Sequence, residues 1–345
     1  MTYVFSQGDR EFAKESKAVL ELLRHLRNHP AHDLTLSVEP REFGVWVCDL
    51  HAADLPPGEG ILTVYTSGTT GTPKPNRHPL SRLFSKPSSG NPSDNWLLCY
   101  SPFRWAGLSV IAHAINIGAS LKIPDSTAPQ DLVTAIRDAT HVSLTPSLFR
   151  KLVIADADSL SQAPLRQITF GGEWAGQAVL DLCRELFPAA RITHVYASSE
   201  LGDVCAVSDG KAGYPKEKLG DHALLATGEL VLRGHHTGDF WEEREGRLYF
   251  LGRGAEHISV GGALIAATTV EEAALCHPAI KQAQAYPLPS PLLGQIIGLR
   301  YVGEPSIDEM RSFLRERLPK VAVPMKFEKV TEITLTESGK LARAT

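Results

Sequence analysis

The chain has 345 residues, which is enough for two or three domains. Its net charge of −4 and charged content of 21% are those of an ordinary globular protein, and neither indicates a nucleic-acid or anionic-membrane partner. No apolar run approaches the roughly 20 residues of a membrane span. The first residues do not resemble a signal peptide, so a cytoplasmic location is expected. The five cysteines are scattered without a Cys-x-x-Cys pair, which argues against a zinc site or a disulfide framework.

The hydrophobic pattern predicts an alternation of helices and strands along the chain. Apolar positions with helical spacing predict helices at 10–29, 103–117, 176–187, 270–276 and 307–318. Short apolar or β-branched runs predict strands at 43–50, 61–65, 96–100, 140–146, 191–196, 248–251 and 296–301. The polar, turn-rich segment 82–95 is expected to be a loop. This alternation indicates an α/β protein.

One segment has the composition of a polyphosphate-binding loop. The predicted strand 61–65 is followed by a run of hydroxyl residues and glycines that ends in a lysine: Thr66, Ser67, Gly68, Thr69, Thr70, Gly71, Thr72, Pro73 and Lys74. Glycines let backbone N–H groups turn toward an anion, hydroxyls add donors and the lysine adds a charge. A flexible surface turn is the alternative. A Walker loop is excluded because Lys74 lies between two prolines, so that no helix begins there.

This segment resembles the phosphate loop of adenylate-forming enzymes, which include acyl-CoA synthetases, peptide-synthetase adenylation domains and luciferases. The family pattern Tyr-Thr-Ser-Gly-Thr-Thr-Gly-x-Pro-Lys is present in full at residues 65–74. Further segments resemble family motifs and follow in the family's order: 103–107, 140–146, 171–173, 196–200, 228–234, 237–239, 252–255 and 335–343. Because several weak matches occur in one order, the resemblance is much stronger than any single motif.

The resemblance implies an α/β fold with two domains. Residues 1–252 are expected to form a large N-terminal adenylation domain of mixed and parallel sheets with flanking helices. Residues 253–345 are expected to form a small, mobile α+β lid domain that carries Lys340. Only about 60 residues precede Ile61, and few residues separate Gly234 from Thr237, so the chain resembles a compact variant similar to succinylbenzoate-CoA ligases. A second copy or another partner would cover the sheet edge that a shortened N-terminal region exposes.

The resemblance also assigns the nucleotide-binding residues. The phosphate loop, from Thr66 to Gly71 with Lys74, would hold the β- and γ-phosphates of ATP. The adenine pocket would be formed by Gly171, Gly172, Glu173 and Tyr196. Ser199 would approach the α-phosphate, Asp239 would accept the ribose hydroxyls and Arg253 would assist there. Glu200 would hold Mg²⁺, a cation that prefers carboxylate oxygen. Taken alone, Glu200 and Asp239 could equally be solvated loop acids.

Lys340 is the expected catalytic lysine, because the family's lysine at this position bridges the attacking carboxylate and the α-phosphate. Without the motif around it, a lysine five residues from the end would be read as a solvated terminal residue. Arg104 replaces the histidine of a family motif, and with Trp105 and Trp174 it is the candidate acyl pocket. Two tryptophans favour a flat acid, and an arginine could pair with a second carboxylate. The alternative is a packing cluster.

The expected function is ATP-dependent activation of a carboxylic acid as acyl-AMP, with release of pyrophosphate, followed by transfer to a thiol. The substrate is expected to be an aromatic or cyclic acid, and the cofactors ATP, Mg²⁺ and CoA or a carrier-protein phosphopantetheine. Gly261 and Gly262 would face the thiol tunnel, and Ala255 replaces the family's acidic hinge residue. Two alternatives stay open: an enzyme that loads a carrier protein or an amine, and a nucleotide-binding pseudoenzyme that regulates a partner.

Overall fold

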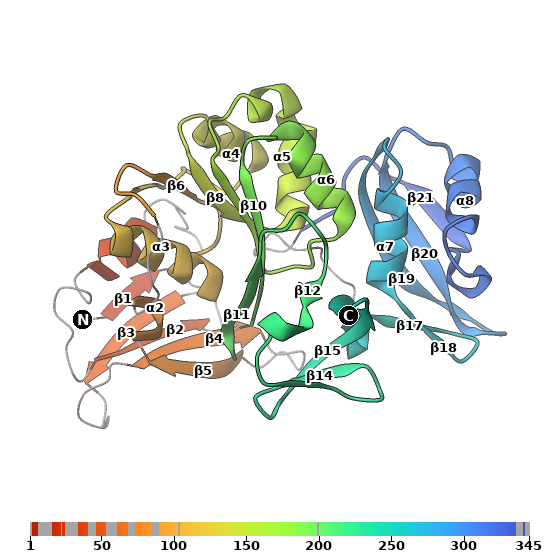
Figure 1. Ribbon diagram of the computed structural model, residues 1–345, viewed down its shortest axis with the longest axis horizontal. Helices are drawn as coiled ribbons and strands as arrows, with labels where there is room; N and C mark the ends of the chain where they lie inside the picture. Colours follow the sequence, from red (N-terminus) through yellow and green to blue (C-terminus); the bar gives the residue numbers. More distant parts are fainter. Residues whose placement is uncertain are drawn as a thin grey trace.

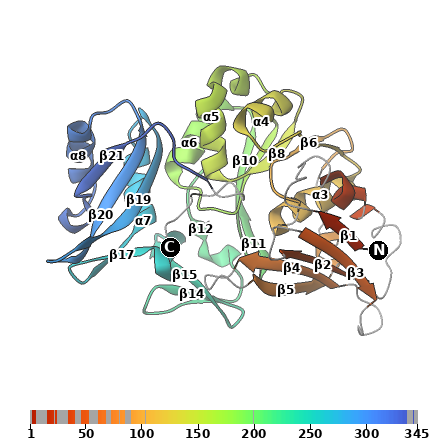
Figure 2. The ribbon, with the colours of Figure 1, turned by 180° about the vertical axis from the view of Figure 1, so that it is seen from behind.

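A computed structural model describes residues 2–5, 16–21, 23–24, 34–40, 46–52, 61–67, 73–79, 81–84, 90–102, 104–198, 200–335 and 341. In Figure 1 the chain forms adjoining lobes, with a separate lobe made by its last quarter, from β17 onward. Figure 2 shows the same arrangement from behind. Four sheets organise these lobes.

The first sheet contains the strands of the N-terminal region, in the order β1-β3-β2-β4-β5. These strands are β1 (Thr2–Phe5), β3 (Trp46–Ala52), β2 (Leu34–Pro40), β4 (Ile61–Ser67) and β5 (Pro73–Pro79). β4 and β5 are antiparallel, and their register pairs Thr66 with Lys74. The expected phosphate loop therefore joins two paired strands. Its residues Gly68, Thr69, Thr70 and Gly71, and the side chains of Thr66, Ser67 and Lys74, lie outside the described residues.

The second sheet is mainly parallel and has the order β11-β10-β9-β8-β6-β7. Its strands are β6 (Asn95–Leu98), β7 (Ser120–Lys122), β8 (His141–Leu144), β9 (Gln167–Phe170), β10 (Arg191–Ser198) and β11 (Gly202–Val207). Only β11 runs antiparallel to its neighbour among these described strands. Parallel strands require crossover connections, which the helices between them provide.

Helices cover both faces of this second sheet (Figure 1). Trp96 and Leu98 of β6 pack with α2 (Ser81–Phe84) and α3 (Trp105–Ile117) in one hydrophobic core. Leu97 points to the opposite face, where the second core contains residues of α4 (Pro129–Ile136), α5 (Pro146–Ser161) and α6 (Gln177–Leu186). Successive strand residues face opposite sides, so a strand covered on both faces is apolar throughout.

The third sheet has the order β12-β16-β15-β14-β13. Its strands are β12 (Tyr214–Pro215), β13 (His222–Leu224), β14 (Glu229–Leu232), β15 (His235–Arg244) and β16 (Arg247–Arg253). Tyr214, Leu230, Trp241 and Leu248 are buried together with Tyr196 of β10 in one core. This shared core holds the third sheet against the end of the second.

The C-terminal lobe contains the fourth sheet, in the order β18-β17-β20-β19, with β21 beside β20. Its elements are β17 (His257–Val260), β18 (Ala263–Ala266), α7 (Ala267–Leu275), β19 (Ile280–Ser290), β20 (Gly294–Gly303), α8 (Ile307–Arg315) and β21 (Lys326–Lys329). Leu299 and Tyr301 are fully buried between this sheet and its helices. α8 begins with a capping box in which Ser306 and Glu309 bond each other's backbone N–H groups.

The predicted α/β class, with a large N-terminal and a small C-terminal part, is confirmed. Most predicted helices and strands occur within a few residues of their expected limits. The predicted loop at 82–95 is wrong at its start, where α2 forms because Leu83 is buried against α3. Of the helix expected at 10–29, residues 16–21 and 23–24 are helical, and the remainder lies outside the described residues. The boundary at residues 252 and 253 stays a prediction.

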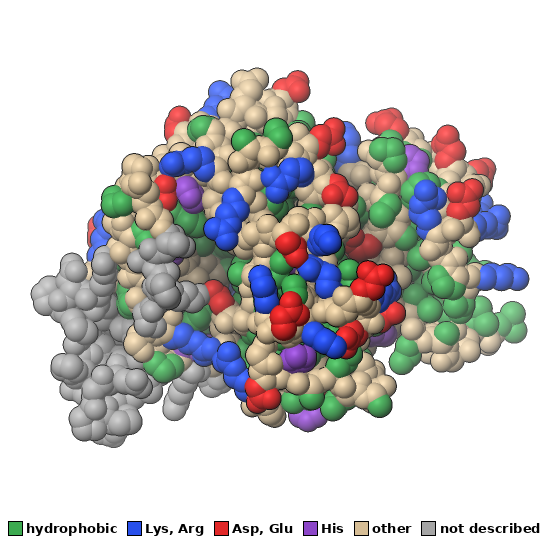
Figure 3. Space-filling view, viewed as in Figure 1, with side chains coloured by type: hydrophobic (Ala, Val, Ile, Leu, Met, Phe, Trp, Pro, Cys, Tyr) green, Lys and Arg blue, Asp and Glu red, His purple; other side chains and the backbone are tan. Residues whose placement is uncertain are grey.

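The surface agrees with the weak net charge. On the face shown in Figure 3, acidic and basic side chains are interspersed over the lobes. Within the described ranges, no helix is long and apolar enough to cross a membrane.

Candidate active site

A cavity of about 850 Å³ opens where the parallel strands end. Tyr100, Pro146, Gly172 and Tyr196 line it, and each lies at or just beyond the carboxyl end of β6, β8, β9 or β10. Ligands of open α/β sheets bind at this edge, since the loops that follow the strands converge there. Residues of β15, β16, α7 and β19 complete the wall, so the large domain and the C-terminal lobe both contribute.

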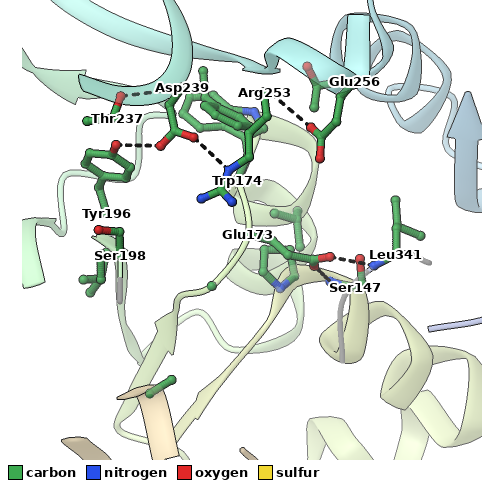
Figure 4. A pocket seen from close by; sticks show the side chains of 18 of the residues that line it. Ser147, Glu173, Trp174, Tyr196, Ser198, Thr237, Asp239, Arg253, Glu256 and Leu341 are labelled. Carbon is green, nitrogen blue, oxygen red and sulfur yellow. Dashed lines mark hydrogen bonds and ion pairs between the residues drawn. The ribbon is translucent and has the colours of Figure 1, made fainter. Parts of the chain in front are cut away.

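Asp239 is the centre of a buried polar cluster in this cavity (Figure 4). The Tyr196 hydroxyl donates to Asp239 Oδ2 at 2.7 Å, and Arg253 Nε donates to Oδ1 at 2.9 Å. Asp239 is only 3% exposed. Burial raises the pKa of Asp239, while Arg253 and Tyr196 act to lower it. Three residues that the sequence assigned to the nucleotide site are therefore together in one hydrogen-bonded cluster.

A tight turn holds the Asp239 backbone in place. The Thr237 hydroxyl donates to the Leu230 carbonyl at 2.6 Å and accepts the Asp239 N–H at 3.1 Å. Glu229 Oε1 accepts the N–H of Gly238 at 3.2 Å, and Gly238 has a φ of +69°, which glycine adopts without strain. Glu229 thus supports the Thr-Gly-Asp turn. The sequence showed Glu229 within a family motif but gave no role for its side chain.

Tyr196 has neighbours that fix its ring. The ring packs edge to face on Trp241, with centroids 4.9 Å apart. Burial raises the pKa of Tyr196, so its phenol stays neutral and donates to Asp239. Glu200 also lines the cavity and is exposed, whereas Ser199 lies outside the described residues. The adenine-stacking role of Tyr196 stays a prediction.

The Gly171-Gly172-Glu173 segment follows β9 into the cavity. The Tyr100 hydroxyl donates to the Gly171 carbonyl at 3.0 Å, and Gly172 turns the chain with a φ of +80°. The Glu173 carboxylate accepts two backbone N–H groups, from Ser147 at 3.0 Å and from Leu341 at 2.8 Å (Figure 4). Leu341 itself lines the cavity. It directly follows the expected catalytic residue Lys340, which lies outside the described residues.

The three residues predicted for the acyl pocket all line the same cavity. Trp105 is buried, its indole N–H donates to Asp203 Oδ1 at 3.0 Å, and its ring packs on His78. Trp174 lies in an aromatic cluster whose members have ring centroids 6.2 to 6.3 Å from its own: Tyr214, Trp241, Tyr249 and Phe250. Arg104 precedes the first turn of α3. Both tryptophans therefore pack on neighbours and also face the cavity.

The expected thiol-tunnel residues are not brought to the cavity. Gly261 and Gly262 form the turn between β17 and β18, with φ values of +58° and +86°. The Gly261 N–H donates to the Leu293 carbonyl of the neighbouring hairpin at 2.9 Å. Neither glycine is among the residues that line the cavity. Their role in thiol transfer stays a prediction.

The structure adds charged residues that sequence reasoning missed. Arg150 of α5 and Glu272 of α7 both line the cavity where the C-terminal lobe meets the large domain. Burial raises the pKa of Glu272 to about 7, and Arg150 opposes that shift. The Glu272 carboxylate occupies the space that a side chain at Gly176 would need. No sequence signal pairs these residues, because helices more than 100 positions apart bring them together.

The described residues contain no group of three or more His, Cys, Asp or Glu side chains that could hold a metal ion by themselves. Glu200 lines the cavity, and its role as the magnesium ligand stays a prediction.

Comparison with known proteins identifies the family of this chain. The AMP-binding enzyme family matches residues 6–255, and the AMP-binding enzyme C-terminal domain matches residues 269–340. The 2-succinylbenzoate–CoA ligase of Geobacillus kaustophilus is 25% identical over 344 aligned positions, which cover 83% of this chain and 68% of that protein.

Solved structures show the same fold. A crystal structure of an anthranilate CoA ligase in complex with anthranoyl-AMP has a TM-score of 0.72 at 19% identity, covering 85% of this chain and 68% of that one. An amide bond synthetase from Marinactinospora thermotolerans has a TM-score of 0.68 at 21% identity, covering 92% and 75%. Because the family match spans most of the sequence, the chain belongs to the AMP-binding enzyme family and is an adenylate-forming ligase of the acyl-CoA synthetase type.

Proposed function

We propose that this chain activates an aromatic or cyclic carboxylic acid with ATP and then transfers the acyl group to the thiol of coenzyme A. In the first step a carboxylate oxygen bonds to the α-phosphorus, and the bond from that phosphorus to pyrophosphate breaks. In the second step the thiol sulfur bonds to the acyl carbon, AMP leaves and the thiol proton passes to water. One observation carries the proposal: the Asp239 cluster and the segment after Lys340 meet in one cavity.

The Asp239 cluster fits the ribose of ATP. Each carboxylate oxygen of Asp239 already accepts one hydrogen bond, from Tyr196 or from Arg253, and each has lone-pair capacity left for a ribose hydroxyl. Because the two protein donors fix the carboxylate, it needs little reorganisation when the nucleotide binds. The phosphate loop, with Lys74, would then extend along the triphosphate.

Activation brings two anions together, so charge neutralisation is the main catalytic task. Glu200 would hold Mg²⁺, which when bound neutralises charge on the phosphate oxygens. Lys340 would meet the charge that develops between the carboxylate and the α-phosphate. Leu341 supports this role because its N–H, part of the peptide group joined to Lys340, is bonded inside the cavity.

The acid is proposed from the cavity wall and from the relatives. Trp105 and Trp174 present aromatic surface, and Arg104 is the basic residue beside them. The related ligases are named for 2-succinylbenzoate and anthranilate, both aromatic acids. An acid with an aromatic ring and a second polar or anionic group fits these side chains best.

The test is acid-dependent exchange of labelled pyrophosphate into ATP, measured over benzoate-type, dicarboxylic and fatty acids. We expect exchange with aromatic acids, and loss of at least about 100-fold in Lys340→Ala with ATP affinity kept, because the lysine acts on charge that exists only in the transition state. No exchange with any acid, despite ATP binding, would favour the regulatory pseudoenzyme. Normal exchange in Lys340→Ala would contradict the role of the lysine.

The acceptor is tested separately. The acid with the highest exchange rate is incubated with ATP and coenzyme A, with a phosphopantetheinylated carrier protein, or with an amine, and the products are identified by mass spectrometry. The proposal predicts the CoA thioester as the main product. A carrier-bound product would support a carrier protein as the acceptor. An amide product would support an amine, and one structural neighbour is named an amide bond synthetase.

A further inference from the structure

Glu173 makes a contact that joins the two ends of the candidate site. Its Oε2 accepts the N–H of Ser147, in the first turn of α5. Its Oε1 accepts the N–H of Leu341, which is 168 positions away in the chain. Figure 4 shows the carboxylate between these two backbone groups. One side chain of the large domain therefore joins the start of α5 to Leu341 at the cavity wall.

The first of these bonds fixes the carboxylate to a rigid element. The first backbone N–H groups of a helix have no partner within the helix, and the helix dipole favours a negative charge there. Ser147 is such a donor, so α5 orients Glu173 and stabilises its charge. Because one oxygen is anchored in this way, the other has a defined direction toward Leu341.

The hydrogen bond from the Leu341 N–H to Glu173 fixes the backbone next to Lys340. The N–H of Leu341 belongs to the peptide group that joins it to Lys340, so fixing that group fixes the backbone adjacent to the lysine. Leu341 is also paired with Leu335 in an isolated antiparallel bridge. The hydrogen bond to Glu173 attaches Leu341 to the large domain.

We propose that Glu173 is a positioning residue for the first half-reaction. It holds the backbone N–H of Leu341, and with it the peptide group joined to Lys340, in place while the adenylate forms, and this bond breaks when the C-terminal lobe moves for thiol transfer. This inference rests on the proposed function. A carboxylate suits the task because it accepts two N–H groups with two equivalent charged oxygens, whereas an amide offers one accepting oxygen.

The test separates the two half-reactions in Glu173→Gln, Leu341→Pro and the double variant. Pyrophosphate exchange reports adenylate formation, and the reaction of synthetic acyl-adenylate with coenzyme A reports thiol transfer. We expect Glu173→Gln to lower the exchange rate constant about tenfold or more, as loss of a charge-assisted hydrogen bond would. The thiol-transfer rate and the Tm should stay close to those of the wild type.

Leu341→Pro removes the donor of the same bond, because proline has no N–H. If Glu173 acts through its hydrogen bond with Leu341, the double variant loses no more pyrophosphate-exchange activity than the more impaired single variant. Glu185→Gln is the matched control, since Glu185 is an exposed carboxylate on α6 that does not line the cavity. It should leave both half-reactions unchanged.

Three results would overturn the inference: unchanged exchange in Glu173→Gln, an equal loss in both half-reactions with a lowered Tm, or a raised KM for ATP at an unchanged rate constant. The second would mark a structural residue and the third a nucleotide contact. Failure of the proposed function looks different, because the wild type itself would then show no exchange with any acid.

Discussion

At the scale of single residues, Asp239 shows how burial and hydrogen bonding shape one functional group. Its carboxylate is almost fully buried, which costs free energy unless partners compensate. Tyr196 and Arg253 supply those partners; Tyr196 lies near the end of β10 in the second sheet, and Arg253 ends β16 in the third sheet. The residue that the sequence assigned to ribose is thus held by protein groups in a fixed orientation.

We predict that Asp239→Asn weakens ATP binding about 10-fold or more, because the amide has one accepting oxygen and no charge. Isothermal titration of ATP into both proteins measures this effect. Asp221→Asn is a suitable control, because Asp221 is exposed next to β13 and does not line the cavity. Equal ATP affinity in Asp239→Asn and wild type would show that Asp239 has only a structural role.

Arg104 is the residue on which acid preference should depend. An arginine beside the bound acid favours a substrate whose second carboxylate can pair with the guanidinium group. Arg104→Leu should therefore shift preference from acids with a second carboxylate toward neutral aromatic acids, without removing all activity. Comparing kcat/KM for the two acid classes in both proteins checks this, and an unchanged ranking would exclude Arg104 from acid recognition.

At the scale of elements, the contact of α7 with α5 and the Gly176 turn joins the C-terminal lobe to the large domain. Glu272 of α7 fills the space beside Gly176, which has no side chain to obstruct it. Arg150 of α5 is 7% exposed and interacts electrostatically with Glu272. Glu271 bonds instead to the Ala285 N–H within the C-terminal lobe, at 2.9 Å. This interface therefore places a partly buried ionisable acid at the wall of the cavity.

The raised pKa of Glu272 predicts a pH dependence of stability. In the folded protein the carboxyl group titrates near pH 7 instead of its ordinary 4.5, so the folded state binds more protons between these values. The contribution of Glu272 to the unfolding free energy is therefore fully present below pH 4.5 and is lost as the pH rises through 7. The full shift corresponds to about 3 kcal/mol at most, and access through the cavity reduces this.

Glu272→Gln removes that titration. The unfolding free energy of the variant minus that of the wild type should therefore rise by up to about 3 kcal/mol between pH 4.5 and 8. The substitution also changes the surroundings of Arg150, so the test uses the change of this difference with pH. Urea unfolding at several pH values measures the difference, with Glu185→Gln as the exposed control. A difference that does not vary with pH would show that Glu272 titrates normally.

At the scale of the whole molecule, the proposed function uses different positions of the C-terminal lobe for its two half-reactions. In this structure Leu341 lies in the cavity, whereas Gly261 and Gly262 do not. The arrangement therefore corresponds to adenylate formation in the proposed function. An ion pair between Lys151 of α5 and Glu332, with Nζ and Oε1 2.6 Å apart, links the lobe to the large domain in this position.

Fixing that position should separate the two steps. Cysteines at Lys151 and Glu332, joined by a short bismaleimide in a Cys276→Ser background, would hold the lobe where the ion pair now lies. We expect pyrophosphate exchange to persist and CoA thioester formation to fall at least 10-fold, as a block of a required domain movement would do. The singly substituted proteins treated with the same reagent are the controls. Thioester formation at the normal rate in the linked protein would show that no such movement is needed.

The α/β class, most helices and strands, and the family could be predicted from the sequence, because these depend on local periodicity and on motifs of neighbouring residues. The strands predicted at 61–65 and 191–196 and the motif at 237–239 are such local features. The loop predicted at 82–95 is wrong at its start, since burial of Leu83 against α3 outweighs its polar surroundings.

Only the tertiary structure decided which distant groups meet. Glu173 with Leu341, and Arg150 with Glu272, come from segments separated by more than 100 positions, and nothing local in their sequences marks them as partners. The same holds for Trp105 and Trp174, whose packing neighbours are as important as the cavity they face. The physical reason is that hydrogen bonding, burial and pKa depend on the surroundings that folding creates, whereas periodicity and turn preferences are properties of the local chain.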